Sequence, residues 1–363
     1  MEAIRARALL ARAAGLSAEH LQALIAAAGG EPARAVEPRA TREVQLPAAA
    51  RAFLVAPDEP TVAADLDWLA ASGAHLLLCT DADYPPLLRD TAGAPAALYV
   101  LGSVPALASP QLAMVGSRNP TPSGRETARA FAAWFARTGL TVTSGLAVGI
   151  DAASHEGALS VEGLTVAVCG TGLDRVYPGE HAALAARIRA HGALVSEFPP
   201  RTAPLRRHFP RRNRIISGLT LGTLVVEAAR HSGSLITARL AAEQGREVFA
   251  IPGSIHSPVS RGCHQLIRDG AKLVEEAADV LAELRISFPK ETLTAPCSPS
   301  EKPPALDKEY EMLLDALGFE PATIDVLVAR TRLAPESVAS MLLILELQGR
   351  VAALPGGRYG RIP

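Results

Sequence analysis

The sequence predicts an α/β protein built on a doubly wound, mostly parallel sheet, with a small helical domain before it and a winged-helix domain after it. Seven short runs of apolar residues recur between residues 111 and 276. Segments of 10 to 20 residues with helical periodicity separate most of these runs. Apolar strands that alternate with helices are typical of a parallel sheet covered on both faces. At 363 residues the chain is too long for one compact core, so two or three domains are expected.

Residues 1–75 are rich in alanine and mostly helical in pattern. The stretch RARALLARAAGLSAEHLQALIAAAG predicts two short helices around Gly15, with Ser17 as the N-cap of the second. A transitional stretch, DADYPPLLRDTAGAPAALYVLG, follows and is interrupted by Pro85, Pro86 and Pro95. We therefore expect a helical N-terminal domain that ends near residue 75.

The seven apolar runs mark the strands of a central domain that we assign to residues 76–286. They are QLAMVG (111–116), LTVTSG (140–145), TVAVCG (165–170), ALVSEF (193–198), GTLVVE (222–227), EVFAIP (247–252) and AKLVEE (271–276). Intervening segments such as SGRETARAFAAWFARTG and PGEHAALAARIRAHG predict the helices. Ligands of doubly wound sheets bind beyond the carboxyl ends of the strands, so the residues that follow each strand are the candidate site.

The C-terminal part divides into a linker and a small domain. Residues 286–306 hold five prolines without sustained periodicity, and we assign a linker to 287–306. Residues 307–363 show three helical stretches and then VAALPGGRYGRI, which predicts two short strands. Three helices and a hairpin indicate a winged helix.

The composition is that of a globular protein, with 48% hydrophobic and 20% charged residues. We find neither a signal-peptide pattern nor a run of about 18 apolar residues, so no membrane association is expected. The cysteines are scattered without a CxxC pair, and the histidines show no metal-ligand spacing. These features predict a cytoplasmic protein without a metal site.

The segment RRHFPRRNR (206–214) carries five arginines in a chain whose formal net charge is −1. No Asp or Glu occurs between Glu197 and Glu227, although Arg201 adds a sixth arginine. Neutralisation by neighbouring residues therefore looks unavailable, and so much positive charge predicts an anionic partner.

The same segment predicts a helix whose amino end binds nucleic acid. Pro210 suits the first turn of a helix, which would place the arginines near the positive end of the helix dipole. Ile215 and Ile216 follow and would anchor the segment to a core. Phe209 sits among the charges, and aromatic side chains in basic grooves stack unpaired bases. A core position for Phe209 beside Pro210 is the alternative.

The first strand of the central domain ends in VGSRNPTPSG (115–124), a second candidate anion site. Gly116 would let the backbone turn, Ser117 and Arg118 would follow at the strand end, and Ser123 would cap the next helix. Backbone N–H groups at such a turn favour anions, although a glycine turn without a ligand is equally common. The stretch GTGLDR (170–175) lacks the third glycine of a dinucleotide fingerprint, which argues against a nicotinamide or flavin cofactor.

Two acidic features have other expected roles. Glu227 at a strand end could act as a general acid or base, but no partner nucleophile is evident, so we expect a hydrogen-bond acceptor that orders neighbouring arginines. In the winged helix, residues 307–363 hold eight acidic and six basic residues, and the expected recognition helix PESVASMLLILELQG has no Lys or Arg. This predicts a contact with protein rather than duplex DNA.

Several long blocks follow one another in order through about residues 80–285. These blocks are MVGSRNPTPSGRETAR, TSGLAVGIDAASHEGAL, VAVCGTGLDRVYPGEHAAL, LVSEFPP, FPRRNRIISGL, VVEAARHSGSLITARLAAEQGREVFAIPGS and GCHQLIRDGAKLV. In sequence and in order they closely resemble the DNA-processing protein A (DprA) family.

The resemblance implies an extended Rossmann fold, a homodimer, and sequence-independent binding of single-stranded DNA without catalysis. It further implies a recombination mediator that loads RecA onto single strands during natural transformation and helps displace single-strand-binding protein. Arg206 matches a position that is often lysine in the family. The DNA-binding residues that the resemblance implies are Ser117, Arg118, Arg206, Phe209, Arg211, Arg212, Asn213 and Arg214.

An enzyme is the alternative function. The scaffold also resembles that of nucleoside-monophosphate phosphoribohydrolases, whose phosphate loop reads PGG-x-GT-x-x-E. Here SGLTLGTLVVE keeps Gly222, Thr223 and a nearby Glu227 but lacks the Pro-Gly-Gly start. Its spacing from Thr223 to Glu227 is also one residue longer.

Overall fold

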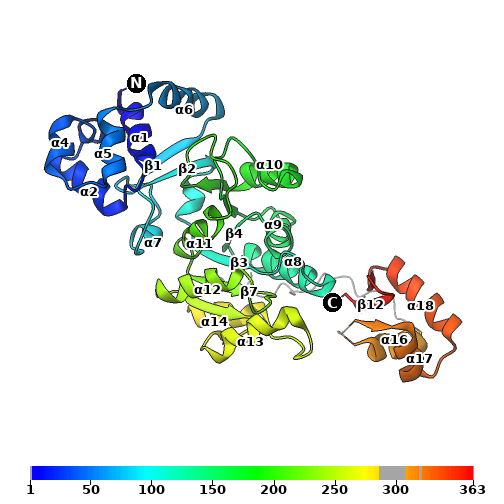
Figure 1. Cartoon of the computed structure of the whole chain (residues 1–363). Coiled ribbons are helices and arrows are strands. Elements are labelled where there is room, and N and C mark those ends of the chain that lie inside the picture. The colour runs from blue at the N-terminus through cyan, green and yellow to red at the C-terminus, as the bar shows by residue number, and fades with distance from the viewer. Residues whose placement is uncertain (1, 286–306, 319–320, 363) are drawn as a thin grey trace.

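The computed structural model describes residues 2–285, 307–318 and 321–362 (Figure 1). Six helices precede the first strand, as the alanine-rich pattern predicted. Ser17 caps the second of them, since its Oγ accepts from the His20 backbone N–H at 3.2 Å. The helices are α1 (Glu2–Arg12), α2 (Ala18–Ala27), α3 (Pro32–Ala35), α4 (Pro38–Glu43), α5 (Ala48–Val55) and α6 (Glu59–Ser72).

The central sheet has nine strands in the order β1-β2-β6-β5-β4-β3-β7-β8-β9. Strands β3 to β9 pair in parallel with one another, and they include all seven predicted strands. The bounds are β1 (His75–Leu78), β2 (Ala97–Gly102), β3 (Gln111–Val115), β4 (Thr141–Ser144), β5 (Thr165–Val168), β6 (Ala193–Ser196), β7 (Gly222–Val225), β8 (Glu247–Ala250) and β9 (Lys272–Leu273).

The sequence did not predict β1 and β2. These strands extend the sheet at one edge, because β2 pairs antiparallel with β6 and β1 pairs antiparallel with β2. The segment that we described as transitional therefore contains a buried strand. Its apolar run, Ala97–Leu101, is fully part of the core, while the prolines before it belong to the connection and to the short helix α7 (Pro86–Arg89).

Helices cover both faces of the sheet, which confirms the doubly wound architecture. Leu112 and Met114 of β3 pack with one set of helices, and the alternate residues Ala113 and Val115 pack with another. This alternation is what a two-residue strand period requires. The helices are α8 (Pro122–Arg137), α9 (Ile150–Leu159), α10 (Ala182–His191), α11 (His208–Gly218), α12 (Ser234–Glu243), α13 (Arg261–Arg268) and α14 (Ala277–Leu284).

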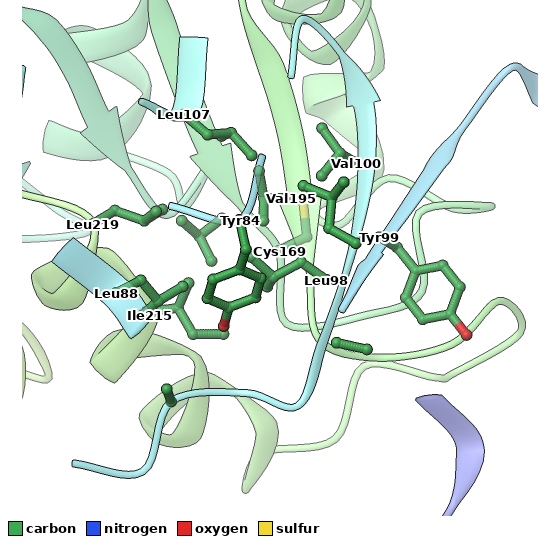
Figure 2. Packing of buried hydrophobic residues seen from close by; sticks show 14 of the residues in the cluster. Tyr84, Leu88, Leu98, Tyr99, Val100, Leu107, Cys169, Val195, Ile215 and Leu219 are labelled. Carbon is green, nitrogen blue, oxygen red and sulfur yellow. The ribbon is translucent and has the colours of Figure 1, made fainter. Parts of the chain in front are cut away.

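Helix α11 is held by an apolar cluster that also contains α7 and β2. Figure 2 shows Ile215 and Leu88 beside the ring of Tyr84, with Leu219 close by. Ile215 and Ile216 are buried, as predicted for the anchor of the basic segment. The Tyr84 hydroxyl donates a hydrogen bond to the Pro95 carbonyl at 2.7 Å, so the buried polar end of the ring is satisfied.

The chain reverses its direction of winding at β3. Strands β4, β5 and β6 follow on one side of β3, whereas β7, β8 and β9 follow on the other. The loops after β3 and β7 therefore diverge, and they leave a crevice at the carboxyl edge of the sheet. The candidate anion site predicted for residues 115–124 lies at this switch point.

The C-terminal residues form the predicted winged helix with a core of its own. A three-stranded sheet in the order β10-β12-β11 completes it. The predicted linker, 287–306, lies outside the described residues. No helix in the described ranges is long and apolar enough to cross a membrane. The elements are α16 (Lys308–Leu317), β10 (Ala322–Thr323), α17 (Ile324–Thr331), α18 (Pro335–Leu347), β11 (Val351–Leu354) and β12 (Arg358–Arg361).

Candidate nucleic-acid interface

A pocket of about 860 Å³ opens at the switch point of the sheet. One wall is the turn after β3, with Ser117 and Arg118. A second wall is the first half of α11 together with Arg206, and the third is the loop after β7 that leads into α12. Three segments that are far apart in the sequence thus meet around one cavity.

The turn after β3 requires glycine at position 116. A Cβ there would lie 2.7 Å from Ile150 Cγ1 and 2.9 Å from the Glu227 carbonyl oxygen. Ser117 Oγ accepts from the Asn119 backbone N–H at 3.0 Å, so the serine also orders the turn. Arg118 is exposed, and its guanidinium carbon lies 6.0 Å from the centre of the Phe209 ring.

The expected cap of α8 was wrong in detail. Thr121, and not Ser123, is the N-cap, because its Oγ1 accepts from the Gly124 N–H at 2.9 Å. The same hydroxyl donates to Glu227 Oε1 at 2.6 Å, and the Thr121 N–H donates to Oε2 at 2.9 Å. Glu227 is thus an acceptor, as expected, but it orders Thr121 and not arginines. Burial raises the pKa of Glu227, and the bonds from Thr121 act in the opposite direction.

Helix α11 sorts the basic segment onto three faces. Phe209, Asn213 and Ile216 line the pocket, at the spacing that places residues on one side of a helix. Arg211 and Arg214 point toward the end of β6. Residues 208, 212 and 215 are buried. Pro210 lies in the first turn, as predicted.

Glu197 neutralises part of the cluster, which corrects the argument that no acid is available. It follows β6, and its Oε2 accepts hydrogen bonds from Arg214 and, at 2.9 Å, from Arg211. The side chain of Glu197 is only 3% exposed, whereas that of Arg211 is 59% exposed. Burial lowers the pKa of Arg214, and the carboxylate of Glu197 acts against that shift. The sequence count missed Glu197 because it stands at the boundary of the acid-free segment and folds back onto it.

Arg212 is buried beneath the pocket. Its Nη1 donates to the Gly145 carbonyl at 2.6 Å and also to the Val168 carbonyl, at the ends of β4 and β5. Burial lowers the pKa of the guanidinium, and the nearby Asp151 opposes that shift. A Cβ on Gly145 would lie 2.2 Å from Nη1, so any larger residue there would displace the guanidinium. Although Arg212 borders the cavity, its Nη1 donates both of these hydrogen bonds to backbone carbonyls of the sheet edge.

The aromatic side of the pocket contains two rings. The half-buried Phe209 contacts Tyr177 with ring centres 5.4 Å apart and planes inclined at 42°. Its inner edge lies against Gly170, where a Cβ would come within 2.9 Å of the ring. Phe209 therefore packs on the sheet edge, as the core alternative predicted, and also faces the cavity, where the stacking prediction would need it. Tyr177 is 49% exposed, and sequence reasoning did not single it out.

The remaining wall holds two further residues that the sequence did not single out. Arg230 and His231 are exposed and line the pocket opposite α11. Asn213 Nδ2 reaches the Gly233 carbonyl at 3.5 Å and links the two walls. The signal was present as RHSGS (230–234), which begins shortly after the predicted strand 222–227. Among the described residues, no group of three or more His, Cys, Asp and Glu side chains could hold a metal ion.

Comparison with known proteins gives the family. A sequence model described as DNA recombination-mediator protein A matches residues 75–285, more than half of the chain. The chain belongs to this family. A second model, the DprA winged helix domain, matches residues 298–357. Both the predicted family and the predicted extended Rossmann and winged-helix architecture are thereby confirmed.

Individual members of the DprA family are similar to this chain in sequence and in structure. The protein Smf of Escherichia coli is 46% identical over 312 residues, which cover 85% of this chain and 83% of that protein. The X-ray structure of DprA from Streptococcus pneumoniae has 34% identity and a TM-score of 0.67, covering 78% of this chain and 98% of that one. DprA of Helicobacter pylori, solved in a study of its single-stranded DNA binding mode, has 26% identity and a TM-score of 0.53, covering 58% and 95%.

Replacing Arg212 tests its buried role. In Arg212→Met the carbonyls of Gly145 and Val168 lose their donor and Asp151 loses a neighbouring cation, so we expect a loss of roughly 3 kcal/mol in folding free energy. That loss corresponds to a melting temperature lower by roughly 6–12 °C for a domain of this size. Differential scanning calorimetry measures it.

Arg211→Met is the matched control. It removes the same charge from the adjacent, preceding position of α11. Glu197 keeps Arg214 as a partner, so the expected loss of folding free energy is below about 1 kcal/mol. Equal melting temperatures for the two variants would contradict a buried structural role for Arg212.

Proposed function

We propose that this chain binds single-stranded DNA without sequence preference in the crevice at the switch point, and that it does so without catalysis. The observation that carries the proposal is the meeting of Arg118 and Arg206 with the rings of Phe209 and Tyr177 around one cavity. Cations that hold phosphates beside rings that stack bases are the combination used by proteins that bind single strands. The single-strand binding mode described for the Helicobacter pylori relative supports it.

The predicted site residues take different parts in this proposal. Exposed Arg118 and Arg206 contact phosphates. Ser117 orders the turn whose N–H groups face the sugar-phosphate backbone of the DNA. Phe209 receives a base, and Asn213 holds the wall on which it lies. Arg211 and Arg214, tied to Glu197, form a basic rim, while Arg212 supports the helix from below. The missed Arg230 extends the phosphate path across the crevice.

The proposal includes the role of a cytoplasmic homodimer that loads RecA onto single strands during natural transformation and recombination, and helps to displace single-strand-binding protein. The family, whose description is recombination mediator, supports it. A dimer would hold two segments of one strand and gain affinity through linkage. In the winged helix, exposed Leu343 and Leu347 on α18 support a contact with protein rather than duplex DNA.

The phosphoribohydrolase alternative is not favoured. Glu227, the counterpart of the glutamate in that motif, gives both carboxylate oxygens to Thr121 and is not among the residues that line the pocket. The family model that matches residues 75–285 describes a recombination mediator.

Phosphate contact is tested by salt dependence. For Arg118→Ala and Arg206→Ala we expect weaker binding to all single-stranded sequences, and a log–log salt slope flatter by about 0.7 for each lost phosphate contact. Fluorescence anisotropy with labelled oligonucleotides over a range of salt measures both quantities. Arg187→Ala, which removes an exposed arginine from α10 outside the pocket, should leave the slope unchanged. A slope that responds equally to all three variants would place the strand elsewhere.

Base stacking is tested at Phe209. Phe209→Ala should weaken binding by about 1–3 kcal/mol, because a stacked base loses its ring, with no change in salt slope. Phe209→Tyr should bind nearly as well as the native protein. If Phe209→Ala flattens the slope as the arginine variants do, the ring acts by holding a cation in place and the stacking role is wrong.

RecA loading needs a separate assay. On single-stranded DNA covered with single-strand-binding protein, the native chain should shorten the lag before RecA hydrolyses ATP. The double variant Arg118→Ala/Arg206→Ala at the same concentration should not, since it cannot hold the strand. An unchanged lag with the native chain would refute the loading role while leaving strand binding intact.

A further inference from the structure

One buried carboxylate joins the N-terminal helices to the loop that precedes α11. Asp65 of α6 is fully buried. Its Oδ1 accepts from Arg201 Nη2 at 2.6 Å and from Arg12 Nη2 at 2.9 Å, while its Oδ2 accepts from Arg12 Nε. Arg12 belongs to α1 and Arg201 to the loop between β6 and α11, so a single side chain connects three segments.

Further contacts fix the same part of the loop. Arg201 Nη2 also donates to the Thr61 carbonyl at 3.0 Å, and Arg12 Nη2 reaches the Pro200 carbonyl at 3.3 Å. The Arg201 backbone N–H donates to Asp174 Oδ1 at 2.7 Å. Arg201 has a φ of 68°, a left-handed conformation that is unfavourable for a residue other than glycine. The surrounding contacts hold the residue in that conformation.

The clamp lies just before a residue of the proposed DNA site. Arg206 follows Arg201 by five positions and lines the pocket. Downstream, α11 begins at His208, whose ring stacks on Phe198 with centres 4.2 Å apart. Arg206 is therefore carried by a short connection between two fixed points. A short connection with fixed ends samples few conformations, and releasing one end lets it move over many more.

We propose that Asp65 is a positioning residue for single-stranded DNA binding. Through Arg201 it holds the loop so that Arg206 faces the pocket, and the N-terminal helices thus contribute to binding without contacting the strand. This inference rests on the proposed function, because it assumes that Arg206 contacts phosphate.

The charge of Asp65 makes the inference sharply testable. Removing a negative charge from a protein favours binding of a polyanion through long-range attraction. Positioning by Asp65 has the opposite consequence, since loss of the carboxylate would release the loop. The direction of the change in affinity therefore separates the two effects.

The experiment compares Asp65→Asn with Asp67→Asn in the full chain. Asp67 lies two positions away on α6 and is exposed, so the same charge is removed without touching the clamp. For Asp65→Asn we expect about tenfold weaker binding to a labelled single strand, equivalent to about 1.4 kcal/mol. The salt slope should flatten by about 0.7, as for Arg206→Ala. Asp67→Asn should bind at least as tightly as the native chain.

A second variant guards against loss of folding, because Asp65→Asn leaves the largely buried Arg12 and the more exposed Arg201 without a full partner. Arg201→Ala opens the clamp while Asp65 keeps Arg12. In double-mutant cycles, Arg201→Ala should be strongly non-additive with Arg206→Ala and additive with Arg118→Ala. Additivity in both cycles would mean that Arg201 acts only through its charge, which overturns the proposal.

Failure of this inference is distinguishable from failure of the proposed function. If Arg206→Ala weakens binding but Asp65→Asn binds as well as Asp67→Asn, only the positioning role is wrong. If Arg206→Ala itself leaves affinity unchanged, the phosphate contact is wrong and the inference falls with it.

Discussion

The site depends on the buried guanidinium of Arg212. Its two hydrogen bonds to the ends of β4 and β5 tie α11 to the carboxyl edge of the sheet. Once this residue faces inward, the helical period decides where its neighbours point. Phe209 and Asn213 must face the cavity, and Arg211 and Arg214 must face β6. One inward arginine, accommodated by a glycine at position 145, thus determines the chemistry of the outward positions.

Carboxylates then decide which arginines remain available to a ligand. Glu197 forms ion pairs with Arg211 and Arg214, and Asp65 forms ion pairs with Arg12 and Arg201. Within the described parts of the chain, Arg206 and Arg230 form no ion pair, and both line the pocket. In a chain with a formal net charge of −1, attraction for a polyanion must come from such local excess and not from the total.

Much of the fold could be predicted from the sequence, because strands buried on both faces are apolar throughout and carry a strong local signal. Strand β2 carried the same signal, but neighbouring prolines obscured it, and its antiparallel partner β6 lies far along the chain. The sequence predicted which segments form the site, but not how their side chains are arranged. Counting charges could not reveal that Arg212 is buried, or that Glu197 returns to the cluster, since both depend on the phase of α11 and on packing. The local sequence also did not identify the N-cap of α8. The cap is Thr121 and not Ser123, and its hydroxyl donates to Glu227, which is distant in the sequence.

Two shared carboxylates bracket the segment that carries the proposed strand contact. Asp65 holds the loop before Arg206, and Glu197 holds the helix after it. Buried ion pairs are a poor way to gain stability, because desolvation offsets most of the attraction. They are, however, directional, since a carboxylate that accepts from two guanidinium groups fixes the orientation of both. We therefore interpret these two groups as fixing the geometry of the segment, with Arg206 as the cation that they leave facing the cavity.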